Sequence, residues 1–467
     1  MSAQSNWSRR KALKAFGLGL AGFMVPANFN QLKGSTGLSF KEIWEPVIPP
    51  ERPVTAITLG AGARGNIYGN FGINFPEMLN IVGVAEPIPI RRERYTQRHE
   101  IPSDNTFTTW EHVFERPKFA DAIIITTPDD LHYGPCMQAL EMGYDILLEK
   151  PIAPTEQECR DILAKANETG QVVAVCHVLR YAPYFQKMHA LLQTEVMGEI
   201  VSMQHFEPIQ HVHMAHSYVR GNWHNSKEST PIILGKSCHD LDMMRWLIGK
   251  PAKQIAAFGS LKWFRHENAP EGSRRRCMNA CAIESTCPYS ALRIYHRNRE
   301  YTYVFDLPED RSKHGDAILE YLKTTNYGRC VYHMGNDQPD HYVCAMTFED
   351  DITASFNMEA FTSYHGRRTR IMGSMGDIRG DMQEFILTDF RTRESTTFDN
   401  RAGEDDQFGR SGHGGGDWRL MYDWVRAVAK QDPTLLTSTI DASIESHLMG
   451  FAAEKSRQSG IIESITL

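Results

Sequence analysis

A lysine and a histidine in this sequence are residue types that could together oxidise a hydroxyl group. Lys150 follows the strand-like run 145–148 after one intervening residue, and His239 stands just ahead of a helix-like stretch. A buried lysine can polarise a hydroxyl or share its proton, and a histidine can accept that proton while hydride leaves. Either residue alone has an ordinary structural reading, at a strand end or a helix start. Their value as a pair depends on the elements that position them.

A glycine-rich turn near the start of the fold could bind the dinucleotide that such chemistry needs. Gly60, Gly62 and Gly65 follow the β-prone run 55–59 and precede a helix-compatible stretch. In this pattern the first glycine permits a tight turn, the second lets the backbone approach a pyrophosphate, and the third lets helix and strand pack closely. The helix N-terminus then offers free N–H groups to the phosphates. We therefore expect a dinucleotide site here.

Glu86 indicates which dinucleotide is bound. It ends the next β-prone run, 81–85. A carboxylate in this place accepts hydrogen bonds from a ribose diol and repels a 2′-phosphate, which favours NAD over NADP. Arg91 and Arg92 lie close by and weaken that preference, because arginine binds phosphate well.

The segment 54–180 alternates between strand-like and helix-like runs. Apolar runs at 122–127 and 171–176 flank helical stretches, one of which opens with a capping box at Thr155 and Glu158. Strands that alternate with helices indicate a doubly wound parallel sheet, whose ligands bind at the carboxyl ends of the strands. The fold class is therefore α/β.

Five motifs together resemble the Gfo/Idh/MocA family, named after glucose–fructose oxidoreductase, inositol dehydrogenase and rhizopine catabolism. They are Glu149-Lys150-Pro151, Thr127-Pro128 with His132, Arg180-Tyr181, His239-Asp240-Leu241-Asp242, and Gly373-Ser374-Met375-Gly376-Asp377. The resemblance runs from about residue 54 to the C-terminus. It implies an N-terminal Rossmann domain over 54–180. It also implies a C-terminal α/β domain over 181–467, with a large, mostly antiparallel sheet that commonly mediates oligomerisation.

The resemblance also assigns roles to individual residues. It implies that Lys150 and His239 are catalytic. The residues expected at the cofactor are Gly60, Gly62, Arg64, Gly65, Glu86, Thr127, Pro128, His132, Glu149 and Lys150. The residues expected at a sugar or polyol substrate are Arg180, Tyr181, His216, Arg220, Trp223, Lys236, Asp242 and His413.

One position departs from the family pattern. Dehydrogenases of this family often place an aspartate four residues before the motif histidine, where this chain has Gly235 followed by Lys236. A carboxylate partner for His239 is therefore missing from its usual place. We expect Lys236 either to contact substrate or to pair with Asp242.

Two histidine-bearing loops supply further candidates. The stretch 211–224 mixes histidines, arginine and aromatic residues, as sugar sites do. A metal site or a solvated loop are the alternatives there. The glycine-rich segment 411–418 could hold His413 near the ligand as a lid, or it could be a plain loop with Asp417 as a helix N-cap.

Four of the nine cysteines are spaced so that they could act together. They are Cys277, Cys281, Cys287 and Cys330. Four thiolates could form a structural zinc site, and an iron–sulfur cluster is a further possibility. Disulfides are plausible if the protein is exported, and free thiols are the remaining alternative.

The N-terminus resembles a twin-arginine export signal over residues 1–27. Arg9 and Arg10 precede a short apolar stretch, and a Pro-rich linker follows over 28–53. That apolar stretch is too short to span a bilayer as a helix. An amphipathic N-terminal helix is the alternative. A periplasmic or exported protein is therefore expected, with a cytoplasmic one as the second choice.

Composition excludes several classes of protein. The chain has 467 residues, of which 41% are hydrophobic and 23% charged, so that it is neither disordered nor fibrous. Its net charge of −7 disfavours nucleic acid and anionic membranes as partners. A small carbohydrate or polyol substrate and a homo-oligomer are the partners we expect.

Three functions are compatible with this sequence. The first is an NAD-dependent oxidoreductase acting on a sugar, polyol or glycoside hydroxyl. The second resembles glycoside hydrolase family 109, in which retained NAD transiently oxidises the sugar before elimination, hydration and re-reduction. The third is a binding or sensor protein, which only Gly235 favours. Because free NAD is scarce outside the cytoplasm, export would require the cofactor to be retained. We expect the oxidoreductase.

Overall fold

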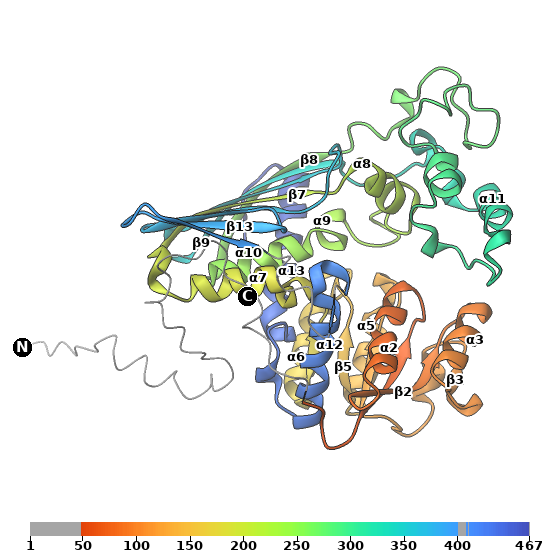
Figure 1. The fold of residues 1–467 in the computed structure, drawn as a ribbon, viewed down its shortest axis with the longest axis horizontal. Coiled ribbons are helices and arrows are strands. Elements are labelled where there is room, and N and C mark those ends of the chain that lie inside the picture. Colours follow the sequence, from red (N-terminus) through yellow and green to blue (C-terminus); the bar gives the residue numbers. More distant parts are fainter. Residues whose placement is uncertain (1–47, 400–407, 410, 467) are drawn as a thin grey trace, which may run out of the picture.

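The computed structural model describes residues 48–399, 408–409 and 411–466, and it contains two β-sheets (Figure 1). The first sheet lies in the lower half of the view and the second in the upper half, and helices from both halves meet between them. The export-signal segment 1–27 and nearly all of the linker 28–53 lie outside the described residues. Among the described residues, no helix is long and apolar enough to cross a membrane.

The first sheet has six parallel strands in the order β3-β2-β1-β4-β5-β6. The strands are β1 (Val54–Leu59), β2 (Leu79–Ala85), β3 (Thr106–Phe107), β4 (Ala122–Ile125), β5 (Asp145–Leu148) and β6 (Val173–Val175). The helices between them are α2 (Ala63–Asn74), α3 (Pro89–Arg98), α4 (Glu111–Phe114), α5 (Tyr133–Glu141) and α6 (Glu156–Thr169). Strand β4 is buried along its whole length, as its run of isoleucines requires. The predicted doubly wound sheet is confirmed.

Local signals explain where these helices begin and end. At the start of α6, Thr155 and Glu158 form the predicted capping box, in which each side chain binds the other residue's backbone N–H. The same helix ends at Gly170, which adopts the left-handed conformation (φ 75°) that glycine tolerates best. Helix α2 begins directly after Gly62, so that its free N–H groups face the end of β1.

The second sheet has nine strands in the order β14-β13-β12-β11-β7-β10-β9-β8-β15. They are β7 (Ile200–Pro208), β8 (Ala252–Ser260), β9 (His341–Phe348), β10 (Thr353–Glu359), β11 (Arg368–Gly373), β12 (Gly376–Gly380), β13 (Glu384–Asp389), β14 (Ser395–Asp399) and β15 (Glu463–Ser464). All neighbouring pairs are antiparallel except β7 and β10. The predicted large, mostly antiparallel sheet is confirmed.

Helices cover the face of this sheet that is turned toward the first domain (Figure 1). They are α7 (Pro183–Leu192), α9 (Ile232–Gly235), α10 (Cys238–Ile248) and α13 (Ile440–Ser459). Between β8 and β9 the chain makes an excursion over residues 261–340, which we call the insertion. It carries α11 (His314–Thr324) and a π-helical turn (Leu292–Arg297), and it packs beside α8 (His211–His213) and the π-helical turn that follows α8 (Met214–Arg220).

The chain returns to the first domain near its end. Helix α12 (Gly412–Lys430) packs against α2 and β1, and its Trp424 is fully buried in the core of the Rossmann sheet. The indole N–H of Trp424 donates to the carbonyl of Ile146 in β5 at 3.1 Å. The expected boundary at residue 180 lies between the last strand of the first sheet, β6, and the first strand of the second, β7. It does not divide the hydrophobic cores, because α12 completes the first one.

Candidate active site

The glycine-rich turn has the geometry that a pyrophosphate requires. A Cβ atom added to Gly60 would lie 2.6 Å from the carbonyl oxygen of Thr126, and one added to Gly65 would lie 2.2 Å from the carbonyl oxygen of Gly60. A Cβ atom on Gly62 would meet nothing within 4 Å. The outer glycines therefore permit close packing inside the protein, while Gly62 borders open space at the start of α2. These residues fit a bound dinucleotide.

Glu86 lies at the predicted place beside this turn. Its carboxylate is buried and accepts backbone N–H bonds from Ala61 at 2.8 Å and from Ile88 at 2.9 Å. The two arginines that weaken the preference for NAD are both engaged. Arg92 donates to the carbonyl of Glu86, and Arg91 Nε donates to Asp306 of the insertion at 2.8 Å. The geometry agrees with recognition of a ribose diol.

Lys150 lies just beyond the carboxyl end of β5, the edge where a Rossmann sheet holds its ligands. Its Nζ donates to the carbonyl of Gly235 at 2.9 Å and lies 5.9 Å from the ring centre of Trp223. Gly235 ends α9, three residues before α10 begins. The lysine therefore crosses from the first domain to the helices of the second.

His239 lies in the first turn of α10, across from this edge of the sheet. Its ring centre is 5.7 Å from that of His413 and 6.0 Å from that of His177, and its Nδ1 has no partner in the protein. Burial, with the positive charge of Lys150 nearby, holds the pKa of His239 well below its usual value. The imidazole is therefore neutral at pH 7, the form that can accept a proton.

A buried ionic network connects the cofactor turn with His413. Arg64 in α2 binds the carboxylates of Glu149 and Asp417, the latter at 3.0 Å, and Asp417 also binds Nδ1 of His413 at 3.0 Å. Burial alone would raise the pKa of Asp417, but His413 and Arg64 leave that pKa below its usual value. Arg64 therefore connects Glu149, at the end of β5, with Asp417 and so with His413. Asp417 is buried in this network and is not an N-cap residue, because the regular part of α12 begins directly after Gly415, whose φ is 91°.

Asp129 is a functional candidate that the sequence did not reveal. A Cβ atom on Gly235 would lie 3.0 Å from Thr230 Oγ1 and 3.4 Å from Trp223 Cδ1, so that an aspartate there would require these two side chains to shift. Asp129, from the turn after β4, accepts hydrogen bonds from both of those residues at 2.9 Å. A carboxylate from the first domain therefore lies close to the position that lacks one. No local motif marks it, since Asp129 and Thr230 meet only through the fold.

Aromatic rings pack together where the π-helical turn Met214–Arg220 meets the insertion. His216 is stacked on Tyr301, with ring centres 4.3 Å apart, and its Nδ1 is hydrogen-bonded to Tyr295 at 2.9 Å. Burial lowers the pKa of His216 to about 3, so that the ring is neutral. Tyr303 is 64% exposed and lies beside the same histidine. His216 is also stacked on Tyr327, with ring centres 5.3 Å apart, so that its buried ring has no free face for a substrate.

Several predicted substrate residues serve the protein interior instead. Arg180 binds the Asp242 carboxylate through two hydrogen bonds, of 2.7 and 2.6 Å, and also donates to backbone carbonyls near α13. The Tyr181 hydroxyl is hydrogen-bonded to Ser438 at 3.0 Å. Their partners place all three residues at the domain junction. The expected pairing of Lys236 with Asp242 is wrong, because Lys236 Nζ instead lies 3.1 Å from Glu207 Oε1.

Two further predicted residues act as internal braces. Arg220 is buried and donates to the carbonyls of Arg329 and Tyr289, at 2.7 and 2.6 Å, so that it anchors the insertion and does not face a substrate. Both ring nitrogens of His132 lie within hydrogen-bond distance of backbone carbonyls, those of Pro151 and Thr127. Its role is to connect the loops after β4 and β5. Pro128 precedes the short turn Asp129–Leu131 in the first of those loops.

The four predicted metal-binding cysteines lie in or near the insertion. The strand-like segments around Cys277 and Cys330 run side by side, and the amide of Ala291 lies 3.4 Å from Cys277 Sγ. All nine cysteines are free thiols. Among the described residues, no group of three or more histidine, cysteine or acidic side chains could hold a metal ion as arranged. The predicted zinc or iron–sulfur site at Cys277, Cys281, Cys287 and Cys330 is therefore not found, nor is one at the histidines of 211–216.

Two family models match this chain. One describes an oxidoreductase family with an NAD-binding Rossmann fold and matches residues 55–177, and the other describes the C-terminal α/β domain of the same family and matches residues 189–462. The chain belongs to the Gfo/Idh/MocA oxidoreductase family. This oxidoreductase therefore binds NAD through the Rossmann domain, and the resemblance seen in its motifs is confirmed.

Similar proteins include enzymes of sugar and polyol chemistry. The oxidoreductase YteT of Bacillus subtilis is 26% identical over 75% of this chain and 82% of its own length. The scyllo-inositol 2-dehydrogenase (NAD(+)) of B. subtilis is 25% identical over 45% of this chain and 58% of its own. A 2,7-anhydro-N-acetylneuraminate hydratase of Escherichia coli is 26% identical over 30% of this chain and 37% of its own.

Solved structures share the fold. Levoglucosan dehydrogenase, in complex with NADH and levoglucosan, superposes with a TM-score of 0.65 at 16% identity, over 89% of this chain and 100% of that one. An inositol dehydrogenase homologue of Azotobacter vinelandii, in complex with NADH and myo-inositol, gives 0.62 at 15% identity, over 89% and 98%. Relatives of this kind act on CH–OH groups with NAD.

Proposed function

We propose that this enzyme oxidises one hydroxyl group of a sugar, polyol or glycoside, with Lys150 and His239 at the reacting carbon. When bound, NAD⁺ supplies the acceptor for hydride. The single observation that carries the proposal is that Lys150, from the edge of the first sheet, reaches Gly235 and so approaches α10, which bears His239.

The two residues divide the work on the hydroxyl group. His239 is neutral and its Nδ1 has no partner, so that it can accept the hydroxyl proton. The ammonium group of Lys150 can bind the same oxygen and stabilise the negative charge that develops on it. The His239 ring then carries a proton next to His413, whose Asp417 carboxylate adds a compensating charge.

The substrate would lie between these groups and the ring surface of the insertion. Tyr303 of the insertion is 64% exposed and can offer its ring to the substrate. Trp223, beside Lys150, is fixed by Asp129 and offers its ring to the same space. These contacts support a polyhydroxylated substrate with one apolar face.

The test uses purified protein without added nucleotide. Glycosides and free polyols are incubated with it and the products are read by mass spectrometry. We expect a product two hydrogens lighter than its substrate, together with reduced nucleotide on the protein, and we expect neither from a Lys150→Met variant that still binds NADH. An unchanged product yield in that variant would refute the proposed role of Lys150.

A second candidate is a hydrolase or hydratase that oxidises its substrate only transiently. Two relatives named 2,7-anhydro-N-acetylneuraminate hydratase favour it, because that name describes addition of water without net oxidation. The same experiment separates the two candidates. A split glycoside with one added water and no net redox change would select the second.

We further propose that the protein is exported with NAD already bound. Arg9 and Arg10 at the N-terminus support export by the twin-arginine route. Fusion of residues 1–53 to a reporter that is active only after export tests this, with Arg9→Lys/Arg10→Lys as the control. Export of the wild-type fusion alone is the expected result, and equal export of the control would contradict it.

A homo-oligomer formed through the second sheet is also proposed. Phe258 and Val343 lie opposite each other on β8 and β9, and they are 67% and 42% exposed. Large exposed apolar side chains on a sheet face suit a second copy of the chain. Light scattering should give a mass above one chain, which Phe258→Asp should reduce.

A further inference from the structure

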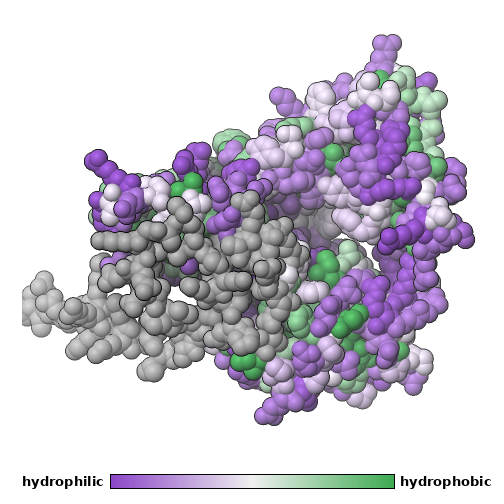
Figure 2. Space-filling model, viewed as in Figure 1, coloured by the Kyte–Doolittle hydropathy of each residue, from purple (hydrophilic) through white to green (hydrophobic). Residues whose placement is uncertain are grey.

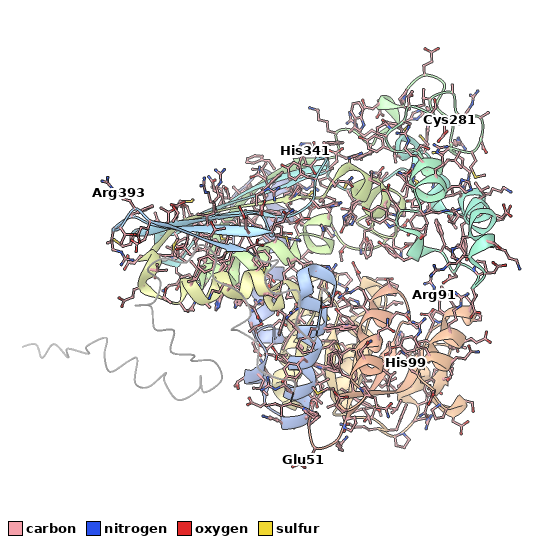
Figure 3. The ribbon with its side chains drawn as sticks, in the orientation of Figure 1. Glu51, Arg91, His99, Cys281, His341 and Arg393 are labelled. Carbon is pink, nitrogen blue, oxygen red and sulfur yellow. The ribbon has the colours of Figure 1, made fainter. Side chains whose placement is uncertain are left out.

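The insertion reaches back across the molecule and binds the Rossmann domain. Arg91 Nε donates to Asp306 Oδ1 at 2.8 Å, and Arg94 donates to the carbonyl of Leu307 at 2.9 Å. Both arginines belong to α3, and both acceptors belong to the insertion. Figure 3 labels Arg91 at the edge of the first domain that faces the insertion. Figure 2 shows hydrophilic residues over this region, as a contact between charged groups requires.

This contact lies beside the expected ribose site. Helix α3 begins at Pro89, three residues after Glu86, and the Glu86 carboxylate binds the amide of Ile88. A dinucleotide whose pyrophosphate lies at Gly62 would therefore place its adenosine ribose close to α3. The side chains of Arg91 and Asp306 are only 30% and 21% exposed, so that the pair is partly shielded from water.

We propose that Asp306 determines the cofactor specificity of this enzyme and slows cofactor release, by holding Arg91 away from the ribose and joining the insertion to α3. This inference rests on the proposed function only in requiring that the chain binds NADH.

Charge explains the effect on specificity. Arginine at the end of the second Rossmann strand is the side chain that accommodates a 2′-phosphate, because its guanidinium group binds phosphate through two hydrogen bonds. In this chain Arg91 Nε donates a hydrogen bond to Asp306, and Arg92 donates one to the carbonyl of Glu86. The carboxylates of Glu86 and Asp306 would both repel a 2′-phosphate. NAD is thereby favoured although two arginines stand beside its site.

Connectivity explains the effect on release. The two domains are joined covalently at the far side, near Arg180, where that residue binds Asp242. They also meet where Lys150 binds Gly235 and where Asp129 binds Thr230. The contacts of Arg91 and Arg94 add a further connection, at the adenosine side. The domains cannot separate over a bound dinucleotide unless these contacts break, so that their loss should speed dissociation.

The test needs no substrate. Full-length protein is stripped of nucleotide, titrated with NADH and with NADPH by fluorescence, and each complex is chased with excess NAD⁺ to measure its release rate. The variants are Asp306→Ala, Arg91→Ala and the double variant. Glu320→Ala is the matched control, because Glu320 lies exposed on α11 of the same insertion and, among the described residues, its carboxylate pairs with Lys323 alone. Asp306→Asn replaces Asp306→Ala if the latter does not fold.

The two single variants should differ in their affinity for NADPH. Asp306→Ala frees Arg91, and it should tighten NADPH binding about tenfold, the worth of one good charged contact. It should also speed NADH release several-fold. Arg91→Ala should speed NADH release without any gain in NADPH binding, and the double variant should lose the gain. The control should match the wild type.

Each other outcome decides something. Unchanged NADPH affinity and NADH release in Asp306→Ala would overturn the inference, as would a gain in NADPH binding that persists in the double variant. A wild-type protein that binds neither nucleotide would refute the proposed function, and with it the basis of the inference.

Discussion

The space around Gly62 and Gly65 predicts that substitution by alanine has different effects at the two positions. It should impair cofactor binding at Gly62 and stability at Gly65. In Gly62→Ala the new methyl group meets no protein atom within 4 Å, so that the free energy of unfolding should change by less than about 0.5 kcal/mol. In Gly65→Ala the methyl group would lie 2.2 Å from the carbonyl oxygen of Gly60. Relief of that overlap needs a backbone shift, and such overpacking costs about 1–3 kcal/mol.

Thermal unfolding and NADH titration together measure both effects. Gly65→Ala should lower the melting temperature by several degrees, at about 2–4 °C per kcal/mol for a domain of this size. Gly62→Ala should melt with the wild type but bind NADH at least about tenfold more weakly, because its methyl group takes the space where the backbone approaches a pyrophosphate. Wild-type NADH affinity in Gly62→Ala would refute the placement of the cofactor. Equal melting of the two variants would refute the packing analysis.

Three further predictions concern the reaction centre and the core. Lys150→Met should lower kcat about 10²–10⁴-fold with NADH binding unchanged, whereas the exposed Lys455→Met should match the wild type; equal loss in both would contradict the assignment. Trp424→Ala should lower the free energy of unfolding by denaturant by about 3–5 kcal/mol and weaken NADH binding. Unchanged stability would show that α12 is not needed for the Rossmann core. Burial lowers the pKa of His177, His239 and His447, so that the unfolded chain binds more protons than the folded one below about pH 6.5. The free energy of unfolding should therefore decrease as the pH is lowered, by up to about 1.4 kcal/mol per pH unit for each histidine. Unfolding at about pH 7.5 and about pH 5.5 measures that slope, which His447→Asn should reduce.

The sequence was most informative where function depends on local spacing. Gly60, Gly62 and Gly65 are within six residues of one another, and each serves the purpose that its place in the turn predicts. The strands of the first sheet could be predicted for the same reason. Buried strands and capped helices are defined by their own residues, as Thr155 and Glu158 illustrate.

Long-range pairs could not be predicted in this way. Asp129 meets Thr230 across 101 residues, and Lys236 reaches Glu207 because α10, which follows it, packs against β7. Arg180 has the residue type of a substrate ligand, yet four acceptors at the domain junction satisfy it. Residue type indicates what a side chain can bind. The fold determines which partners lie within its reach.

The cysteines illustrate the same limit. Their spacing is compatible with a metal site, but spacing does not determine where the sulfur atoms point. In the structure Cys277 and Cys330 are buried in two different apolar clusters, and Arg220 lies beside Cys277. Burial raises the pKa of the Cys330 thiol to about 11, and the nearby thiols of Cys277 and Cys287 add to that shift.

The return of α12 to the first domain has a consequence for how the protein is made. Trp424 closes a core whose first strand begins at Val54, so that the two are separated by most of the chain. Contacts of such long sequence separation form late and slow folding. During synthesis the Rossmann domain cannot be completed until its final helix has left the ribosome. A chain truncated after β14 would lose the NAD-binding domain together with the helix, although every glycine of its turn would still be present.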